Sequence, residues 1–185
     1  MSAELEKAQQ YLERSRQLRP QLVISYAWSI ETAKPGCDRR EIEHDRDAAL
    51  GIAPDTWFVR ALYFSAIAPR WCGSLAEMQR FLDQSMPSIE SNPNMKFLKG
   101  RVIFEQGEEL TIMAESPKYQ EALPYYTEAL SYGDYEYYRE GRARTLIALG
   151  RYDEAIADLE AAIRERPSSP YLHERLVYAR SKRTR

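Results

Sequence analysis

Apolar residues recur along this chain at the spacing of α-helices, and two segments carry the same pattern. The segment from Tyr119 to Leu130 aligns with the segment from Tyr152 to Ile163 at a constant offset of 33 residues. In each copy the apolar positions fall at i, i+1, i+4, i+7 and i+8, which places them on one buried face of a helix. The aligned pairs are Ala122/Ala155, Leu123/Ile156, Tyr126/Leu159, Ala129/Ala162 and Leu130/Ile163. The alanines predict close helix crossings.

A second helix precedes each copy, so each repeat is predicted to be a helical hairpin. Residues 100–107 align with residues 143–150, and both stretches end in glycine. The offset here is 43 residues, which leaves about ten extra residues, 109–118, in the earlier repeat. We expect this insertion to lengthen the first helix and to end at Ser116 and Pro117, a cap followed by proline at the first helical position.

The last hairpin resembles the tetratricopeptide repeat family. The stretch from Gly141 to Pro167 carries the small and apolar residues of that repeat of about 34 residues, at Ala143, Leu146, Gly150, Tyr152, Ala155, Leu159, Ala162 and Pro167. Arg139 stands where the family often has tryptophan. The resemblance implies an all-α fold, a right-handed α-α superhelix of about four to five hairpins. First helices would line a concave groove that binds a protein or peptide, and second helices would form the outer wall.

Weaker copies of the pattern extend over the whole chain, which predicts a single solenoid over residues 1–185. Degenerate repeats are expected over 1–93, clearer repeats over 94–134 and 135–168, and a C-terminal capping helix over 169–182. The expected helices span 3–18, 21–34, 39–50, 55–68, 74–90, 95–114, 118–131, 135–149, 152–166 and 169–182. Residues 3–18 match a second helix, so we expect the chain to begin within a repeat.

Composition narrows the classes of partner. The chain has 26 Lys and Arg against 28 Asp and Glu, a formal net charge of −2, which disfavours nucleic acid as a partner. Cys37 and Cys72 lack the spacing of a zinc site or a disulfide framework, so a reducing cytoplasm is expected. No apolar run is long enough to predict a membrane span or a secretory signal.

Chemical motifs are absent, and we therefore expect no catalytic residue, metal or cofactor. The sequence contains no phosphate-binding glycine loop and no nucleophile motif. His44 has Glu41 and Asp45 nearby but no second set of ligands, and Cys72 has no base within reach in the sequence. An enzyme that uses either residue stays an alternative to the binding protein. So does an immunity or inhibitor protein that occludes a partner enzyme.

The stretch from Pro69 to Ser74 departs from the repeat pattern. It resembles a Pro-Arg-Trp-x-Gly-Ser turn of bacterial helical-repeat proteins whose function is unassigned. Ser74 and Glu77 form a capping-box pattern, which predicts a helix start. Trp71 is then a packing anchor of a structural turn, or Arg70 and Trp71 form a contact site.

The groove residues follow from the alignment of the two first helices. Arg101 aligns with Arg144, Phe104 with Ile147, and Asn94 with Tyr137. The two arginines lie outside the packing stripe, and a pair of guanidinium groups can hold the carboxylates of an acidic peptide. The alternative is that both are ordinary exposed arginines. The predicted partner-binding set is Arg101, Phe104, Tyr137, Arg144 and Ile147, with Arg70 and Trp71.

Overall fold

The structure, a computed structural model, describes residues 3–71 and 73–183, and it is all-α. No strand occurs among these residues, which form ten α-helices and three short 3-10 helices, η1 (Lys34–Gly36), η2 (Pro69–Trp71) and η3 (Pro93–Lys96). The α-helices are α1 (Ala3–Leu18), α2 (Val23–Ala33), α3 (Arg39–Ile52), α4 (Trp57–Ala66), α5 (Leu75–Ser91), α6 (Phe97–Glu109), α7 (Tyr119–Leu130), α8 (Glu136–Ala148), α9 (Tyr152–Glu165) and α10 (Pro170–Arg183). The expected helices are confirmed, most of them to within two residues at each end. The described helices include none with the length and apolar character that crossing a membrane requires.

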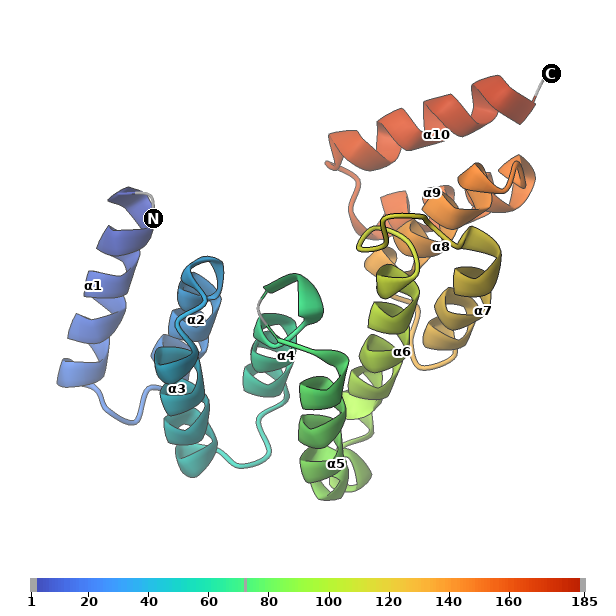
Figure 1. The fold of residues 1–185 in the computed structure, drawn as a ribbon. Helices are drawn as coiled ribbons and strands as arrows, with labels where there is room; N and C mark the ends of the chain where they lie inside the picture. Colours follow the sequence, from blue (N-terminus) through green and yellow to red (C-terminus); the bar gives the residue numbers. More distant parts are fainter. Residues whose placement is uncertain (1–2, 72, 184–185) are drawn as a thin grey trace. The chain divides into compact units, whose positions relative to one another are not determined.

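The contacts of the chain group into two compact units, residues 1–98 and 99–185. In the first unit α2 packs against α1, α3 and α4, and Figure 1 shows α2 and α3 side by side. Ile30, Ile42, Phe64 and Met78 are buried in its core. The expectation of one continuous solenoid over 1–185 stays a prediction.

Side-chain caps fix two helix starts in the first unit. Asp38 accepts a hydrogen bond from the backbone N–H of Glu41 at the start of α3. Ser74 accepts from the backbone N–H of Glu77 at 3.2 Å, and its hydroxyl donates to the Glu77 carboxylate at 3.1 Å. The predicted helix start at Ser74 is confirmed, since a cap satisfies a backbone donor that has no partner inside the helix.

In the second unit successive helices pack on one another, α7 on α8, α8 on α9 and α9 on α10. The predicted packing face is confirmed, because Ala122, Tyr126, Ala129, Ala155, Leu159 and Ala162 are all buried. They belong to two clusters, one around Phe104 and Tyr126 and one around Leu146 and Leu159. Leu172, Leu176 and Ala179 of α10 complete the second cluster.

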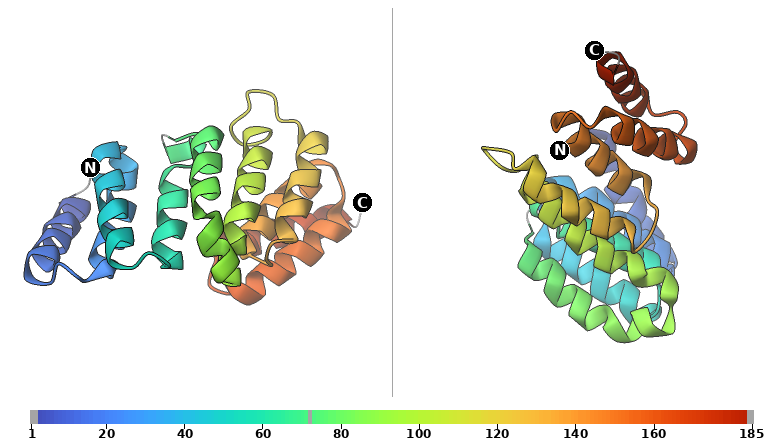
Figure 2. Two further views of the ribbon diagram at one scale, coloured as in Figure 1. Left: turned by 90° about the horizontal axis from the view of Figure 1, so that it is seen from below. Right: turned by 90° about the vertical axis from the view of Figure 1, so that its right-hand side faces the viewer.

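The inserted residues of the earlier repeat form a loop, so the expectation of a longer first helix is wrong. Helix α6 ends at Glu109, and residues 110–118 run as turns beyond the ends of α6 and α7 (Figure 2). The backbone N–H of Lys118 donates to the carbonyl of Leu110 at 2.7 Å and closes this loop. Helix α7 starts at Tyr119, and its N-cap residue Lys118 makes no side-chain cap, so the expected cap at Ser116 with Pro117 in the first helical position is wrong as well.

The two aligned glycines have different roles. Gly150 has φ +75° and ends α8, as a left-handed residue after a helix does. Gly107 lies inside α6, and a Cβ there would stand 3.0 Å from the ring of Tyr126. It permits a close helix crossing and does not close the helix, which corrects its expected role.

Cys37 is disulfide-bonded in the structure, which corrects the expectation that no disulfide forms. It follows η1 with φ 55°, and its Sγ lies 3.8 Å from the carbonyl oxygen of Trp71. Cys72, the other cysteine of the sequence, lies outside the described residues. Two cysteines without a spacing motif carry no signal in the sequence, because disulfide geometry depends on the distance between them in the fold.

Candidate functional site

Five charged residues on α6 and α8 form the most concentrated ionic arrangement on the first helices of the second unit. Arg101, Glu105 and Glu108 come from α6, and Glu140 and Arg144 come from α8. We call this set the Arg–Glu strip. It contains both arginines that the sequence places in a binding groove, together with three carboxylates that the sequence analysis did not select.

Arg101 lies between a carboxylate and an aromatic ring. Its Nη2 is 3.0 Å from Oε1 of Glu105, one turn later on the same helix, and Glu105 is fully buried. The guanidinium carbon is 4.9 Å from the ring centroid of Tyr137, a cation–π distance. Burial lowers the pKa of Arg101, but Glu105, Tyr137 and Tyr138 together outweigh burial, and the pKa stands above its ordinary value. Arg101 is therefore a fixed, neutralised cation.

Arg144 is held by two carboxylates and one hydroxyl. Its Nη2 forms an ion pair with Glu108 and donates to the hydroxyl of Tyr126 at 3.4 Å, and its Nη1 donates to Glu140 at 2.9 Å. Burial lowers the pKa of Arg144, but Glu108, Glu140 and Tyr126 together raise it above the ordinary value. Glu140 also accepts from the hydroxyl of Tyr171 on α10 at 3.1 Å. The positive charge of Arg144 is thus already compensated within the chain.

Behind Arg144 the strip continues into the core. The hydroxyl of Tyr126 donates to Glu108 at 2.7 Å and lies 2.7 Å from the hydroxyl of Thr111. Burial, reinforced by the charge of Glu108, raises the pKa of Tyr126 well above its usual range. The phenol stays protonated, and Glu108 keeps a donor on each side. Glu108 is therefore a structural anchor between α6, α7 and α8.

The contacts between α6 and α8 join residues that are 36 apart in the chain. Arg144 meets Glu108, and Arg101 meets Tyr137. The two aligned arginines, 43 residues apart, therefore hold equivalent places in their repeats but meet different residues of the neighbouring helix.

The other groove residues differ in accessibility. Phe104 is 2% exposed and packs against Tyr126, Tyr137 and Tyr138, so it belongs to the core and offers no binding surface. Tyr137 is half-buried at the edge of this aromatic cluster. Ile147 is half-buried beside the cluster around Leu146. The side chain of Asn94 lies outside the described residues.

Glu140 and Tyr171 are functional candidates that were not predicted from the sequence. Tyr171 follows Tyr137 by 34 residues, which is one repeat, and this spacing was the signal that could have identified it. Its side chain is 40% exposed. Its ring lies 5.1 Å from the guanidinium of Arg175. Glu140 and Arg144 of the strip are thus flanked by two partly exposed tyrosines, Tyr137 and Tyr171.

Arg139, which stands where the repeat family has tryptophan, has a structural role of its own. It forms an ion pair with Asp134 and a second one at 2.9 Å with Asp158. Arg142 donates to the same carboxylate of Asp158 through two nitrogens, each at 2.7 Å. Asp158 is buried on α9, so the two arginines join α8 to α9 by polar contacts.

The predicted contact site at Arg70 and Trp71 lies in the first unit, in η2. Arg70 is exposed and Trp71 is half-buried. The ammonium of Lys34 lies 4.9 Å from the ring centroid of Trp71. His44, the residue weighed for catalysis, is three-quarters exposed, with its Nδ1 3.1 Å from Asp45. The described residues contain no group of three or more His, Cys, Asp or Glu side chains placed to hold a metal ion.

Comparison with known proteins supports the repeat architecture. Residues 115–170, which include α7, α8 and α9, match the family model of the tetratricopeptide repeat. A solved structure with a similar fold is a thermophilic tetratricopeptide repeat protein of Thermus thermophilus. It is 18% identical, with a TM-score of 0.60, and the match covers 95% of this chain and 90% of that chain. No curated protein sequence matches this chain.

Proposed function

We propose that this chain, whose fold is that of a tetratricopeptide-like helical repeat, binds another polypeptide along the first helices of its second unit. Proteins of this fold serve in general as scaffolds for protein–protein interaction. The observation that supports the site is the exposed edge of the Arg–Glu strip, where Glu140 bonds both Arg144 and Tyr171. A scaffold or adaptor role follows, and a cytoplasmic location stays a prediction.

The sequence favoured an acidic ligand, but the structure supports a peptide that offers both apolar and polar groups. Both guanidinium groups of the strip already bond carboxylates, and a ligand carboxylate would have to displace Glu105, Glu108 or Glu140. Displacing a buried ion-pair partner is costly. Tyr137 and Tyr171 offer apolar area with a polar tip, the combination that is enriched at protein interfaces. Ile147 adds apolar contact next to them.

The test is affinity capture from native lysate followed by mass spectrometry, with matched variants of the bait. We expect Tyr137→Ala combined with Tyr171→Ala to reduce capture of the main partner at least tenfold. Arg151→Ala is the control, because Arg151 bonds only its neighbour Glu154 on the surface. Each bait is checked for helicity and melting temperature first. Equal capture by the folded tyrosine variant would place the binding surface elsewhere, with Arg70 and Trp71 examined next.

The design also separates the alternative functions. A captured enzyme that loses activity in a stoichiometric complex would identify the chain as an inhibitor. Arg101→Ala with Arg144→Ala, the direct test of an acidic ligand, is unsuitable because it leaves Glu105 and Glu108 buried without their cations. Loss of binding in that variant would report unfolding and not ligand contact.

A further inference from the structure

A small polar pocket lies in the first unit between α3 and α5. Tyr63 of α4 also lines it. Its volume is about 190 Å³, and its charged and polar lining comprises Arg39, Glu43, Arg46, Glu77, Arg80 and Gln84. We call it the arginine pocket. It involves different helices from the Arg–Glu strip, and the proposed polypeptide binding does not depend on it.

Arg39 is positioned in this pocket by two carboxylates. Its Nη2 is 2.9 Å from Oε1 of Glu43 and 2.5 Å from Oε1 of Glu77. Its Nη1 is buried and has no hydrogen-bond partner. A buried donor without an acceptor is unusual in proteins, since leaving it unsatisfied costs free energy. The two carboxylates therefore fix the guanidinium of Arg39 in place.

The other two arginines add positive charge that the pocket does not neutralise. Arg46 lies over the ring of Tyr63, with its guanidinium carbon 4.4 Å from the centroid, and its Nε bonds Asp47 outside the pocket lining at 2.7 Å. Arg80 on α5 is exposed and forms no hydrogen bond or ion pair with the described residues. Three guanidinium groups thus face two carboxylates, and both carboxylates bond Arg39.

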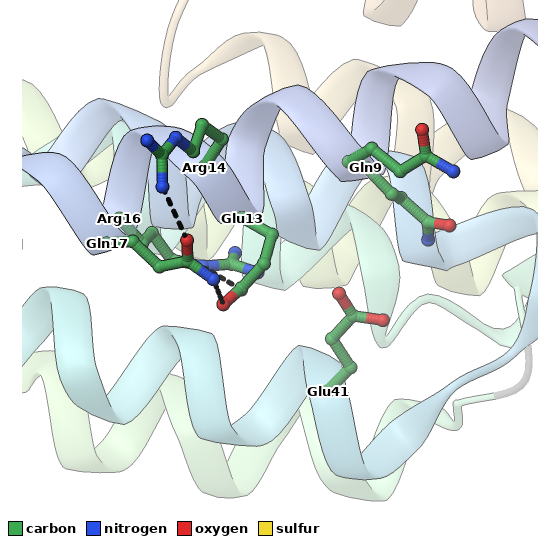
Figure 3. A pocket seen from close by; sticks show the side chains of 7 residues that line it. Gln9, Glu13, Arg14, Arg16, Gln17 and Glu41 are labelled. Atoms are coloured by element: carbon green, nitrogen blue, oxygen red, sulfur yellow. Dashed lines mark hydrogen bonds and ion pairs between the residues drawn. The ribbon is translucent and has the colours of Figure 1, made fainter.

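The arginines of two other pockets among the described residues can be compared with those of the arginine pocket. In the pocket between α1 and α3, Arg14 bonds Gln17 while Arg16 and Gln17 bond Glu13, as Figure 3 shows. In the pocket beside Asp158, each of Arg139, Arg142 and Arg151 bonds a carboxylate. The arginine pocket differs from both, because among the described residues each arginine of those two pockets has a hydrogen-bond partner and Arg80 has none.

We propose that the arginine pocket binds a phosphate group. Planar guanidinium groups match the oxygens of phosphate, and charge-assisted bonds of this kind are about twice as strong as neutral ones. Arg39 is held rigidly, Arg46 is directed by Tyr63, and Arg80 can turn toward an anion without breaking a bond. Gln84 supplies a further polar group in the lining. The phosphate is either free inorganic phosphate or the phosphorylated side chain of a partner.

The test titrates the whole chain with inorganic phosphate at constant ionic strength and follows amide and arginine Nε resonances by NMR. We expect saturable shifts confined to α3 and α5. Arg80→Gln should weaken phosphate binding about tenfold, because it removes one charge-assisted contact and no bond of the folded chain. Arg14→Gln is the matched control, an arginine exposed in the same unit outside the pocket.

The outcomes are separable. Saturable binding that Arg80→Gln weakens and Arg14→Gln does not would support the pocket. Equal weakening in both variants would show general surface attraction and overturn the proposal, as would unsaturable shifts in the wild-type chain. A phosphoserine peptide and its unphosphorylated form then separate the sources. Tighter binding of the phosphopeptide than of free phosphate assigns the site to a partner protein, and weaker binding assigns it to free phosphate.

Discussion

Arg144 on α8 forms an ion pair with Glu108 on α6, 36 residues earlier in the chain. The pair is set inside a larger arrangement, because Glu108 also accepts from Tyr126 and Arg144 also bonds Glu140. Glu108 is 2% exposed and Arg144 18% exposed by side chain. A charge pair at this depth stabilises the fold only while both partners are present.

We predict that Arg144→Met lowers the free energy of unfolding by about 3–5 kcal/mol, because it leaves the carboxylate of Glu108 buried without its cation. Combining it with Glu108→Leu should recover most of this loss, since both charges are then gone and Tyr126 keeps Thr111 as a partner. Urea unfolding of the two single variants and the double variant measures the coupling. Strictly additive losses would show that the pair does not act as a unit.

Two glycines inside helices are predicted to respond to alanine in opposite directions. At Gly141 an added Cβ would stand 2.8 Å from the rings of both Phe104 and Tyr126. Gly141→Ala should therefore overpack the core and lower the free energy of unfolding by about 1–3 kcal/mol. At Gly51 in α3 nothing lies within 4 Å, and Gly51→Ala should stabilise by about 0.5–1 kcal/mol. Thermal unfolding of both variants checks the contrast. A neutral Gly141→Ala would mean that α6 and α8 can separate at little cost.

The fold was largely predictable because helix periodicity and alanine spacing are local signals. The ten helices follow from the 3.6-residue pattern, and Ala122, Ala155 and Ala162 are buried as their positions in the repeat indicate. The inserted loop was not predictable in the same way. Residues 109–118 contain few helix breakers apart from Pro117, and the end of α6 depends on local bonds such as Thr111 to the carbonyl of Gly107.

The candidate site was predictable only in part, since ion pairs depend on which residues meet in space. The alignment selected Arg101 and Arg144 but could not show that Glu105 and Glu108 pair with them. Periodicity indicates which face of a helix is buried, and it does not indicate which residues of the next helix that face meets. The disulfide at Cys37 is similar, because a bond across the fold has no local pattern.

We predict that a reductant lowers the melting temperature of the chain, against the expectation drawn from the sequence. Cys37 is disulfide-bonded, and loss of such a crosslink typically costs about 2–4 kcal/mol by freeing the unfolded chain. Cys37→Ser should melt like the reduced wild type and should no longer respond to reductant. Melting curves with and without the reductant measure both effects. An unchanged wild-type curve would show that the bond adds no stability.

We predict that alkaline pH destabilises the fold through two buried tyrosines, Tyr126 and Tyr138. Both are fully buried, and burial raises the pKa of each phenol above the ordinary value of 10.0. Glu108 raises that of Tyr126 further, and the neighbouring Tyr137 raises that of Tyr138. In the unfolded chain these tyrosines lose their protons near pH 10, whereas in the folded chain they keep them.

The unfolded state therefore binds fewer protons than the folded state above pH 10, and the free energy of unfolding must fall as pH rises. The expected slope is up to about 1.4 kcal/mol per pH unit for each tyrosine, with full stability retained below pH 9. Urea unfolding at intervals from pH 8 to 11.5 measures this slope.

Tyr126→Phe should be less stable than the wild type at pH 8, because Glu108 loses a donor. Its free energy of unfolding should nevertheless fall less steeply with pH, by the contribution of about one proton. Tyr11→Phe is the control, since Tyr11 is 66% exposed and should leave the slope unchanged. A slope that Tyr126→Phe leaves as steep as the wild type would mean that Tyr126 ionises without unfolding the chain, and that the bond to Glu108 is weaker than its geometry indicates.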